Sequence, residues 1–376
     1  MASPKKIKPK KIIKTTLTFL AGLALPVSLV VGWHVAYGQQ DATDKPRQTA
    51  SGSAQRVPQP YQPGSPLPPL PHASAQPQAR PAPQALAKPP VSTASLEQAP
   101  PAPALVPAGD ELDDMRKIFS STVQQPNMER MDRYIKGWKN APKVQQALED
   151  RRNRLARMDK RFLDFVREDV STQMKQRGLA FERTQYFVYA DRNPKTQFVL
   201  VGFYDEDARR IEFLGADLMS SGNLEKGGDY YVTPTGVFEN LVDNFGYRAL
   251  GTPNQDGWRG LGAKDSRVWD FGDQKSLKKY KGGNTVSQMR LLMHSTDPDK
   301  GEPRLGRTDS KGCVRISHTL NHFLDTYAIL DLNYEQWAKT KPESWLLKKD
   351  RRPVSYPGKF LIVGDSTSYF TAQTNP

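Results

Sequence analysis

Cys313 is the single cysteine of the 376-residue chain, and a thiol becomes a strong nucleophile when it is ionised. Without a second cysteine the chain cannot form an internal disulfide, a multi-cysteine zinc finger or a cysteine-ligated iron–sulfur cluster. The thiol must then be buried and inert, paired with another chain, bound to a metal, or a nucleophile. A nucleophile needs a base and a positive environment nearby.

The segment D-S-K-G-C-V-R-I-S, residues 309–317, supplies part of that environment. Gly312 permits close approach of the backbone, and Ser317 is the predicted N-cap of a following helix. Because side chains alternate along a strand, Cys313 and Arg315 are expected on one face of a short strand. A nearby cation lowers the pKa of a thiol, so a thiolate is expected at Cys313.

His294 is the candidate base, 19 residues upstream at the end of the predicted strand R-L-L-M-H. A histidine at a strand end can equally be structural. His318 and His322 lie four residues apart on one face of the predicted helix, and with Cys313 and His294 they could bind zinc. No carboxylate or second cysteine supports that zinc site, and both histidines could simply be exposed or half-buried on the helix.

The combined pattern resembles the signature of the L,D-transpeptidases of the YkuD type. The matching residues are His294-Ser295-Thr296, a spacer with Gly306, and Ser310-Lys311-Gly312-Cys313-Val314-Arg315. Upstream, Ser221-Gly222 and T-P-T-G-V-F at 233–238 are similar to the family's S-x-G and T-P-x-G-x-F stretches. The resemblance covers about residues 184–365, and Lys311 stands where the family usually has histidine.

This resemblance implies a β-sandwich or barrel that acts on peptidoglycan stem peptides without a cofactor or metal. Cys313 would attack the carbonyl before D-Ala, His294 would take the thiol proton, and Ser295 would orient the imidazole. Backbone N–H groups at Gly312 and Cys313 would bind the oxyanion. The further residues expected to support the Cys313 loop or bind substrate are Ser310, Lys311 and Arg315. Transfer of the acyl group to an amine of a second stem would give a 3→3 cross-link.

Other acceptors would change the function without changing the chemistry at Cys313. Water would make the protein a peptidoglycan hydrolase, and a protein lysine would make it an enzyme that anchors proteins to the wall. A non-catalytic, membrane-tethered wall-binding protein is the third possibility, although a binding module has no need of a thiol.

The region before the predicted catalytic domain, residues 109–183, is expected to be helical because apolar residues recur at helical spacing. Pro126 and Pro142 are expected to break it, with Asn140 as the N-cap of the second helix. A basic run follows, which is predicted to be a solvated helix face, with contact to an anionic polymer as the alternative. Its members are Arg151, Arg152, Arg154, Arg157, Lys160 and Arg161.

Residues 184–376 change to a β pattern. Short β-branched and aromatic runs are bounded by turn residues, which is typical of strands. The runs are Y-F-V-Y, Q-F-V-L-V-G-F-Y, R-I-E-F-L-G, V-W-D-F, R-L-L-M-H and G-K-F-L-I-V-G. One helix is predicted between Ser317 and Asp331. The fold class is therefore mainly β, a sandwich or barrel with few helices.

The net charge of +14 suggests nucleic acid at first sight, but its distribution argues against that partner. Residues 1–14 carry six lysines and no acid, whereas residues 108–376 carry 43 bases and 37 acids. Nearly half of the excess therefore lies in a short basic tail, which is expected to be cytoplasmic.

The basic tail precedes an apolar segment, residues 15–38, which has no acid, lysine or arginine and is long enough to span a bilayer. It is predicted to be either a signal anchor in the cytoplasmic membrane or a signal peptide cleaved near Ala36-Tyr37-Gly38. Residues 39–108 form a Pro-, Ala- and Gln-rich linker, with 17 prolines between 46 and 107. Such a segment is expected to be disordered and extended, holding a periplasmic or extracytoplasmic head away from the membrane. The oligomeric state is not indicated.

Overall fold

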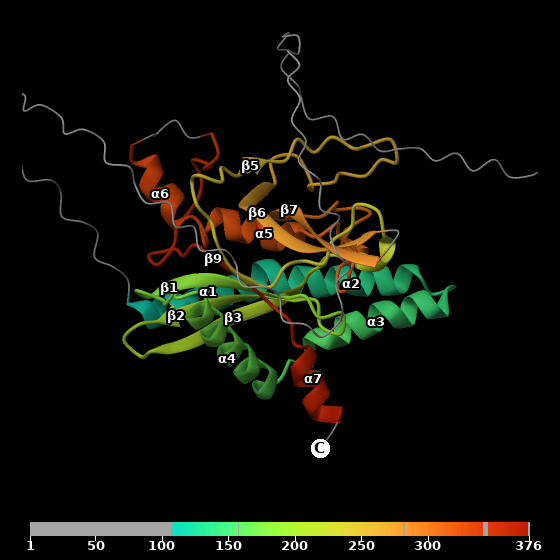
Figure 1. The fold of residues 1–376 in the computed structure, drawn as a ribbon, viewed down its shortest axis with the longest axis horizontal. Helices are drawn as coiled ribbons and strands as arrows, with labels where there is room; N and C mark the ends of the chain where they lie inside the picture. Colours follow the sequence, from blue (N-terminus) through green and yellow to red (C-terminus); the bar gives the residue numbers. More distant parts are fainter. Residues whose placement is uncertain (1–106, 157, 281–282, 341–344, 375–376) are drawn as a thin grey trace, which may run out of the picture. The chain divides into compact units, whose positions relative to one another are not determined.

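A computed structural model describes residues 107–156, 158–280, 283–340 and 345–374. These residues form two β-sheets with helices packed against them (Figure 1). The predicted basic tail and membrane segment, and the linker up to residue 106, lie outside the described residues. Within the described ranges, no helix is both long enough and apolar enough to cross a bilayer.

Sheet A has five strands in the order β3-β2-β1-β9-β4. All neighbours are antiparallel except β1 and β9, which are parallel. The strands are β1 (Gln185–Asp191), β2 (Phe198–Asp205), β3 (Arg210–Leu218), β4 (Gly236–Glu239) and β9 (Phe360–Gly364). The last strand of the chain therefore lies inside the sheet, between the first strand and β4.

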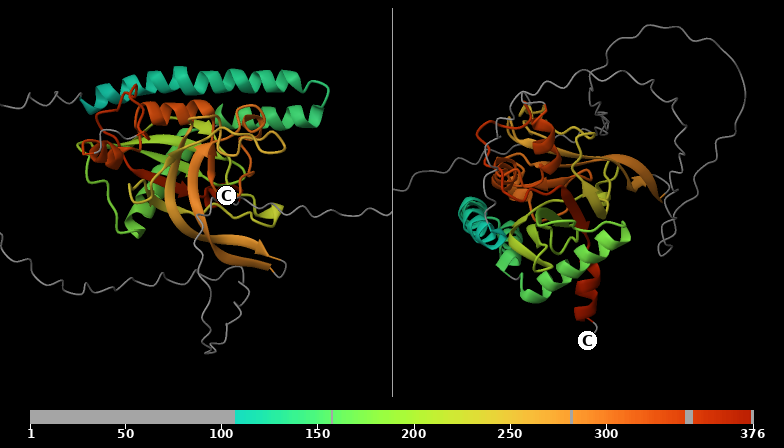
Figure 2. Two further views of the ribbon diagram at one scale, coloured as in Figure 1. Left: turned by 90° about the horizontal axis from the view of Figure 1, so that it is seen from above. Right: turned by 90° about the vertical axis from the view of Figure 1, so that its left-hand side faces the viewer.

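Sheet B has four strands in the order β5-β6-β7-β8. They are β5 (Tyr247–Arg248), β6 (Arg267–Tyr280), β7 (Gly283–Ser295) and β8 (Val314–Ile316). The long hairpin of β6 and β7 projects from the rest of the sheet (Figure 2, left). The short strand β8 pairs with the end of β7 in parallel.

Sheet A is buried on both faces, as the alternation along β1 shows. Tyr186, Val188 and Ala190 belong to a hydrophobic cluster shared with sheet B, α1 and α5. Phe187 and Tyr189 point to a second cluster, shared with α2, α3 and α4. A strand covered on both sides needs apolar residues at every position, which explains the continuous run Y-F-V-Y-A. Because both clusters include residues from the helical region and from the strands, these two parts of the chain share one core.

The helical region comprises α1 (Ala108–Phe119), a π turn (Ser120–Gln124), α2 (Gln125–Gly137), α3 (Pro142–Ala156) and α4 (Lys160–Gln176). The predicted break at Pro126 is wrong, because α1, the π turn and α2 form one rod beside α5 (Figure 2, left). Proline has no N–H and its ring clashes with the carbonyl of residue i−4. In the π turn the amide of Gln125 donates to Ser120, five residues back, and this wider turn places Pro126 in the first turn of α2.

The second predicted break is confirmed, since α3 begins at Pro142. The amides of Val144 and Gln145 both donate to the carbonyl of Ala141, so the N-cap position falls there and not at Asn140. The chain between α2 and α3 reverses direction to form a helical hairpin, which the left view of Figure 2 shows.

The helix expected at 317–331 is shorter, with α5 spanning His318–Thr326. Ser317 caps it as predicted, accepting a hydrogen bond from the amide of Leu320. The helix ends because Ala328 takes a left-handed backbone conformation (φ 52°), which turns Ile329 and Leu330 into the core. Two short helices follow, α6 (Leu332–Ala338) and α7 (Thr367–Thr374).

At the level of fold class, the prediction of a β-rich part preceded by helices is confirmed. The predicted domain boundary at 183/184 falls between α4 and β1.

Candidate active site

The register of β7 and β8 brings the candidate base and the candidate nucleophile onto one side of sheet B. Met293 pairs with Val314, and both are buried in the core between the sheets. Because side chains alternate along each strand, His294 and Cys313 face the other side. His294 pairs with Arg315 of β8, and Cys313 comes two residues before Arg315 on the same side. Cys313 directly precedes β8, so the expectation that it lies within the strand is off by one residue.

The turn before Cys313 is closed by the Ser310 hydroxyl. This group donates to the carbonyl oxygen of Cys313 (2.6 Å) and accepts from the amide of Gly312 (3.0 Å). Gly312 has φ 130°, and a Cβ there would lie 2.8 Å from Cε of Met289. Position 312 therefore requires glycine, because of its positive φ and because there is no room for a side chain. Ser310 stabilises the Cys313 loop through its two hydrogen bonds.

The two upstream motifs meet this turn through Thr233. The Thr233 hydroxyl donates to the carbonyl of Gly312 and accepts from the amide of Gly222, both at 2.8 Å. A Cβ at Gly222 would lie 1.9 Å from the carbonyl oxygen of Tyr231, so this position also has no room for a side chain. The S-G and T-P-T-G motifs are therefore part of the wall that supports the Cys313 loop.

We expect Thr233→Val to lower the free energy of unfolding by about 2–4 kcal/mol, because it leaves the Gly222 amide and the Gly312 carbonyl without their shared buried partner. Valine has nearly the same volume as threonine, so the loss of stability measures the contribution of the hydroxyl group. Urea unfolding measures it. Thr122→Val is the matched control: its exposed hydroxyl bonds only the helical carbonyl of Ile118, and a change below about 0.5 kcal/mol is expected. Equal effects of the two substitutions would contradict the role of Thr233.

The His294 ring is held by the backbone of the next residue. Its Nδ1 lies 2.7 Å from the carbonyl oxygen of Ser295, and a carbonyl can only accept, so Nδ1 carries the hydrogen. In the neutral ring Nε2 then has the free lone pair that a base needs. The Ser295 hydroxyl donates elsewhere, to the carbonyl of Thr296 (3.1 Å). Ser295 therefore orients the imidazole as expected, but through its main chain.

Burial determines the resting protonation of the pair. It raises the pKa of the Cys313 thiol, and the Leu292 backbone and the Arg315 charge offset only part of this rise. It lowers the pKa of His294 to about 4, with the Arg315 charge acting in the same direction. At neutral pH both groups are uncharged, so the predicted resting thiolate is wrong. A neutral pair requires the base to accept the proton as the thiol attacks.

No hydrogen bond joins the Cys313 thiol to the His294 ring in the described part of the chain. The thiol instead donates to the carbonyl oxygen of Arg290, at 3.9 Å. Catalytic hydrogen bonds are often loose without substrate and tighten when it binds. The Gly312 amide, one of the two donors expected to bind the oxyanion, already donates to the Ser310 hydroxyl. The Cys313 amide is then the remaining donor of the predicted pair.

Arg315 is largely buried against a residue that the sequence analysis did not single out. Its Nη1 lies 3.3 Å from the carbonyl oxygen of Asp309 and 3.7 Å from the Asp309 carboxylate. Its guanidinium lies 5.9 Å from the centre of the Trp258 ring. The carboxylate of Asp309 is also paired with Lys226 and Arg304. These contacts favour a role for Arg315 in supporting the loop.

Lys311 is exposed, and its Nζ lies 5.8 Å from the centre of the Tyr230 ring. Within the described ranges it forms no ion pair at hydrogen-bonding distance. A cation two residues before Cys313 can bind an anionic group of a substrate, and here the aromatic ring supports the side chain from one side.

The zinc alternative finds no support in the geometry. His318 and His322 are exposed on α5, whereas His294 is buried. Among the described residues, no three His, Cys, Asp or Glu side chains are grouped closely enough to bind one metal ion.

The basic run spans the end of α3 and the start of α4, and the prediction of a solvated helix face holds for only part of it. Arg151 is buried, and Arg154 donates to the carbonyl of Gly306 (2.8 Å). Arg152 and Lys160 form ion pairs with Asp132 and Asp164, so these two do lie at the surface of the helices. Arg157 is outside the described residues. No local pattern distinguishes Arg151 from its neighbours, because two of its partners, the carbonyl groups of Pro303 and Leu305, are more than 150 residues away in the chain.

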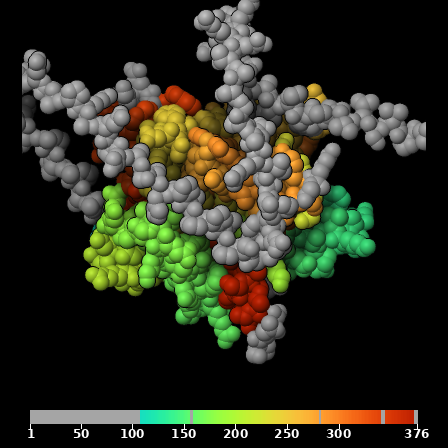
Figure 3. Space-filling model, in the orientation of Figure 1, coloured from blue at the N-terminus to red at the C-terminus, as the bar shows by residue number. Residues whose placement is uncertain are grey.

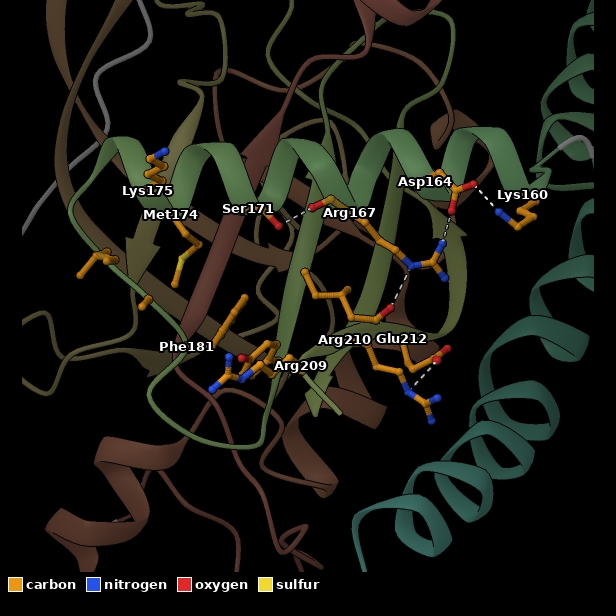
Figure 4. Close-up of a pocket in the computed structure, with 14 residues that line it drawn as sticks. Lys160, Asp164, Arg167, Ser171, Met174, Lys175, Phe181, Arg209, Arg210 and Glu212 are labelled. Atoms are coloured by element: carbon orange, nitrogen blue, oxygen red, sulfur yellow. Dashed lines mark hydrogen bonds and ion pairs between the residues drawn. The ribbon is translucent and has the colours of Figure 1, made fainter. Parts of the chain in front are cut away.

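A cavity of about 690 Å³ lies away from this chemistry, between α4 and the β2–β3 hairpin (Figure 4), whose surfaces adjoin in the space-filling view (Figure 3). Neither Cys313 nor His294 lines it. Arg167 crosses its wall, donating to Asp164 and to the carbonyl of Ile211. Arg210 is paired with Glu212. The two carboxylates of the wall, Asp164 and Glu212, are thus paired with lining cations, and the wall keeps an excess of basic side chains.

The chain matches no protein-family model, and a comparison with curated protein sequences finds no relative.

Proposed function

We propose that this protein is a peptidoglycan L,D-transpeptidase and that the two sheets form the catalytic fold of that family. One observation carries the proposal: His294 at the end of β7 and Cys313 directly before β8 face the same side of sheet B, with Nδ1 of the ring bound to Ser295 and Nε2 left as the acceptor. The hydrogen bonds of Thr233, which join the S-G and T-P-T-G segments to the turn before Cys313, support it independently.

In the proposed first step, Nε2 of His294 removes the thiol proton while the sulfur of Cys313 attacks the carbonyl carbon of the third stem residue. The Cys313 amide stabilises the oxyanion of the tetrahedral intermediate, and one such donor contributes about 3–4 kcal/mol in comparable sites. The C–N bond then breaks, the imidazolium protonates the departing amine of D-Ala, and a thioester remains.

In the second step an amine of another stem peptide attacks the thioester. His294 accepts the proton of this amine, the C–S bond breaks, and the thiolate is reprotonated. The product is a 3→3 cross-link, and no redox partner is needed. The sequence of the first 108 residues supports a single membrane anchor or a signal peptide and an extended linker, and we propose an extracytoplasmic head for this reason.

A carbapenem is the direct probe, because its β-lactam carbonyl acylates a nucleophilic thiol. Incubation of the full-length chain with a carbapenem is expected to add one drug mass, measured by intact mass spectrometry. Cys313→Ala should give no adduct, and the exposed-residue variant His322→Gln should give the wild-type adduct. A folded, reduced wild-type chain without an adduct would refute the acyl-transfer mechanism.

The acceptor is identified by analysis of muropeptides after expression in a bacterium that lacks 3→3 links. New 3→3 dimers are expected. Shortened stems without dimers would identify a hydrolase, and wall-linked protein would identify an anchoring enzyme. An unchanged wall together with an unreactive thiol would identify a non-catalytic wall-binding protein.

A further inference from the structure

The segment Glu302–Asp309, here called the connecting segment, lies between His294 and Cys313 in the chain. Arg151 of α3 reaches into it from the helical hairpin. Its Nη1 donates to the carbonyl oxygens of Pro303 (2.8 Å) and Leu305 (3.0 Å), and its Nε donates to Ala147 one helical turn back (2.8 Å). The aliphatic part of the side chain packs on Gly306, where a Cβ would lie 3.0 Å from Cδ of Arg151.

Arg154, one turn further along α3, continues the same contact by donating to the carbonyl of Gly306. The opposite end of the segment is held by α2, where Arg130 forms an ion pair with the buried carboxylate of Glu302. Glu302 in turn accepts from the amide of His318, the first residue of α5 (2.7 Å). One chain of contacts thus runs from the hairpin through the connecting segment to the helix that follows Cys313.

A buried polar network ties α2 to the same helix a second time. Asn127 donates to the carboxylate of Asp217 (2.8 Å) and to the hydroxyl of Ser317 (3.1 Å). Ser317 is the N-cap of α5 and also donates to Asp217 (2.5 Å). The α2–α3 hairpin therefore contacts Glu302 and Ser317, whose side chains accept hydrogen bonds from the first amides of α5. It also contacts the segment that leads to Cys313.

We propose that the α2–α3 hairpin is a positioning module for the active site, in which Arg151 sets the placement of the connecting segment and thereby that of Cys313 relative to His294. The expected effect on acylation rests on the proposed function, whereas the expected ordering of the connecting segment does not. Arg151 touches neither substrate nor reacting atoms and is a positioning residue.

The connecting segment has one 3-10 turn, Glu302–Arg304, and is otherwise held by contacts with other parts of the chain. The carbonyl oxygens of Pro303 and Leu305 need partners when they are buried, because an unpaired buried acceptor is costly. A guanidinium supplies several donors in a rigid fork, which one side chain of another type cannot do. A displacement of about 1 Å at a reacting group can slow a reaction about 100-fold, so the order of this segment bears directly on rate.

The test compares Arg151→Met with Arg152→Met in the full-length chain. Both remove a guanidinium from α3, but Arg152 is paired with Asp132 within the hairpin. We expect Arg151→Met to slow carbapenem acylation of Cys313 about 10- to 100-fold. Arg152→Met should stay within about twofold of wild type, and Arg151→Lys, which keeps the charge and one of the bonds, should recover part of the rate.

A second control separates positioning from general destabilisation. Val170 is fully buried on α4, which is not part of the α2–α3 hairpin. Val170→Ala is expected to lower stability with little effect on acylation at a temperature where the chain stays folded. Equal slowing by Val170→Ala and Arg151→Met would overturn the proposal, as would a wild-type rate for Arg151→Met.

Hydrogen exchange gives a readout that does not depend on acyl transfer. The amides of Leu305 and Gly306 donate to Glu302 and Met219, and they are expected to exchange faster in Arg151→Met and Arg151→Lys than in Arg152→Met. Trypsin should also cleave sooner after Arg304 and Arg307. If the wild type forms no carbapenem adduct, the proposed function fails while these measurements still decide the positioning role. Unchanged exchange in both Arg151 variants would overturn it.

Discussion

Replacing His294 by glutamine is expected to slow acylation of Cys313 about 10²–10⁴-fold at neutral pH, the usual contribution of a positioned general base. The reason lies in the resting pair: burial raises the pKa of the Cys313 thiol, so few molecules carry a thiolate without the base. The measurement is the rate of carbapenem adduct formation, followed by intact mass spectrometry. The exposed histidines His318 and His322 provide matched controls, and their glutamine variants should react at the wild-type rate.

The pH dependence sharpens this prediction. The pKa of His294 is lowered to about 4, and the base works only when it is neutral. The wild-type rate should therefore be flat well above that value and fall as the pH drops through it. In His294→Gln only the thiolate reacts, so the rate should rise about tenfold per pH unit until the thiol ionises. A flat profile in the variant would show that His294 is not the base.

Gly312→Ala is expected to have the second large effect, lowering the free energy of unfolding by about 2–4 kcal/mol from backbone strain and overpacking combined. The new Cβ would meet Met289 at 2.8 Å and Tyr231 at 3.1 Å, with φ at 130°. Relief of either contact moves the turn that carries Cys313, so acylation should fall about 100-fold as well. Urea unfolding and adduct formation measure the two effects.

Gly228→Ala is the matched control, since Gly228 also has a positive φ (58°) but has open space around its Cα. It should cost only about 1–2 kcal/mol from the left-handed backbone and leave acylation unchanged. The double variant Gly312→Ala with Met289→Ala should be less destabilised than the sum of the two single changes. If Gly312→Ala behaves like Gly228→Ala in both measurements, the crowding at the Cys313 turn has no functional weight.

The strands were predictable because their signal is local. The run Y-F-V-Y-A predicts a strand, and its lack of polar positions is explained by burial on both faces of sheet A. Ser317 was recognisable as an N-cap from its position before an apolar-periodic stretch. The end of that helix was not, since nothing in the residue type of Ala328 indicates a left-handed backbone.

Pro126 shows the limit of a local rule. A proline inside a helical pattern normally ends or kinks the helix. Here Phe119 packs edge-to-face on Phe323 of α5 (5.2 Å between ring centres), and Val123 is fully buried in the same cluster. Packing on both sides of the π turn stabilises a continuous rod, a tertiary effect that a window around residue 126 does not contain.

Part of the candidate site could also be predicted from local sequence, and part depends on tertiary contacts. The pairing of Cys313 with His294 could be proposed from residue types and spacing, whereas their neutral resting form follows from burial, which a sequence does not display. Asp309 lies within the quoted motif, but its role as the shared partner of Arg315, Lys226 and Arg304 depends on segments far apart in the chain. The same holds for Arg151 and its carbonyl partners.

The position of β9 inside sheet A has a consequence for how the chain is made. Strand β4 has β9 as its one neighbour in the described sheet, and β1 pairs with β9 across more than 170 residues of sequence. A chain that is still emerging cannot complete this sheet until residues 360–364 are available. Pairings of such long range fold slowly, because the closure of a long loop precedes the gain in contacts. A chain cut short before Phe360 would leave β1 and β4 without their shared neighbour, and it is expected to be a substrate for quality-control proteases.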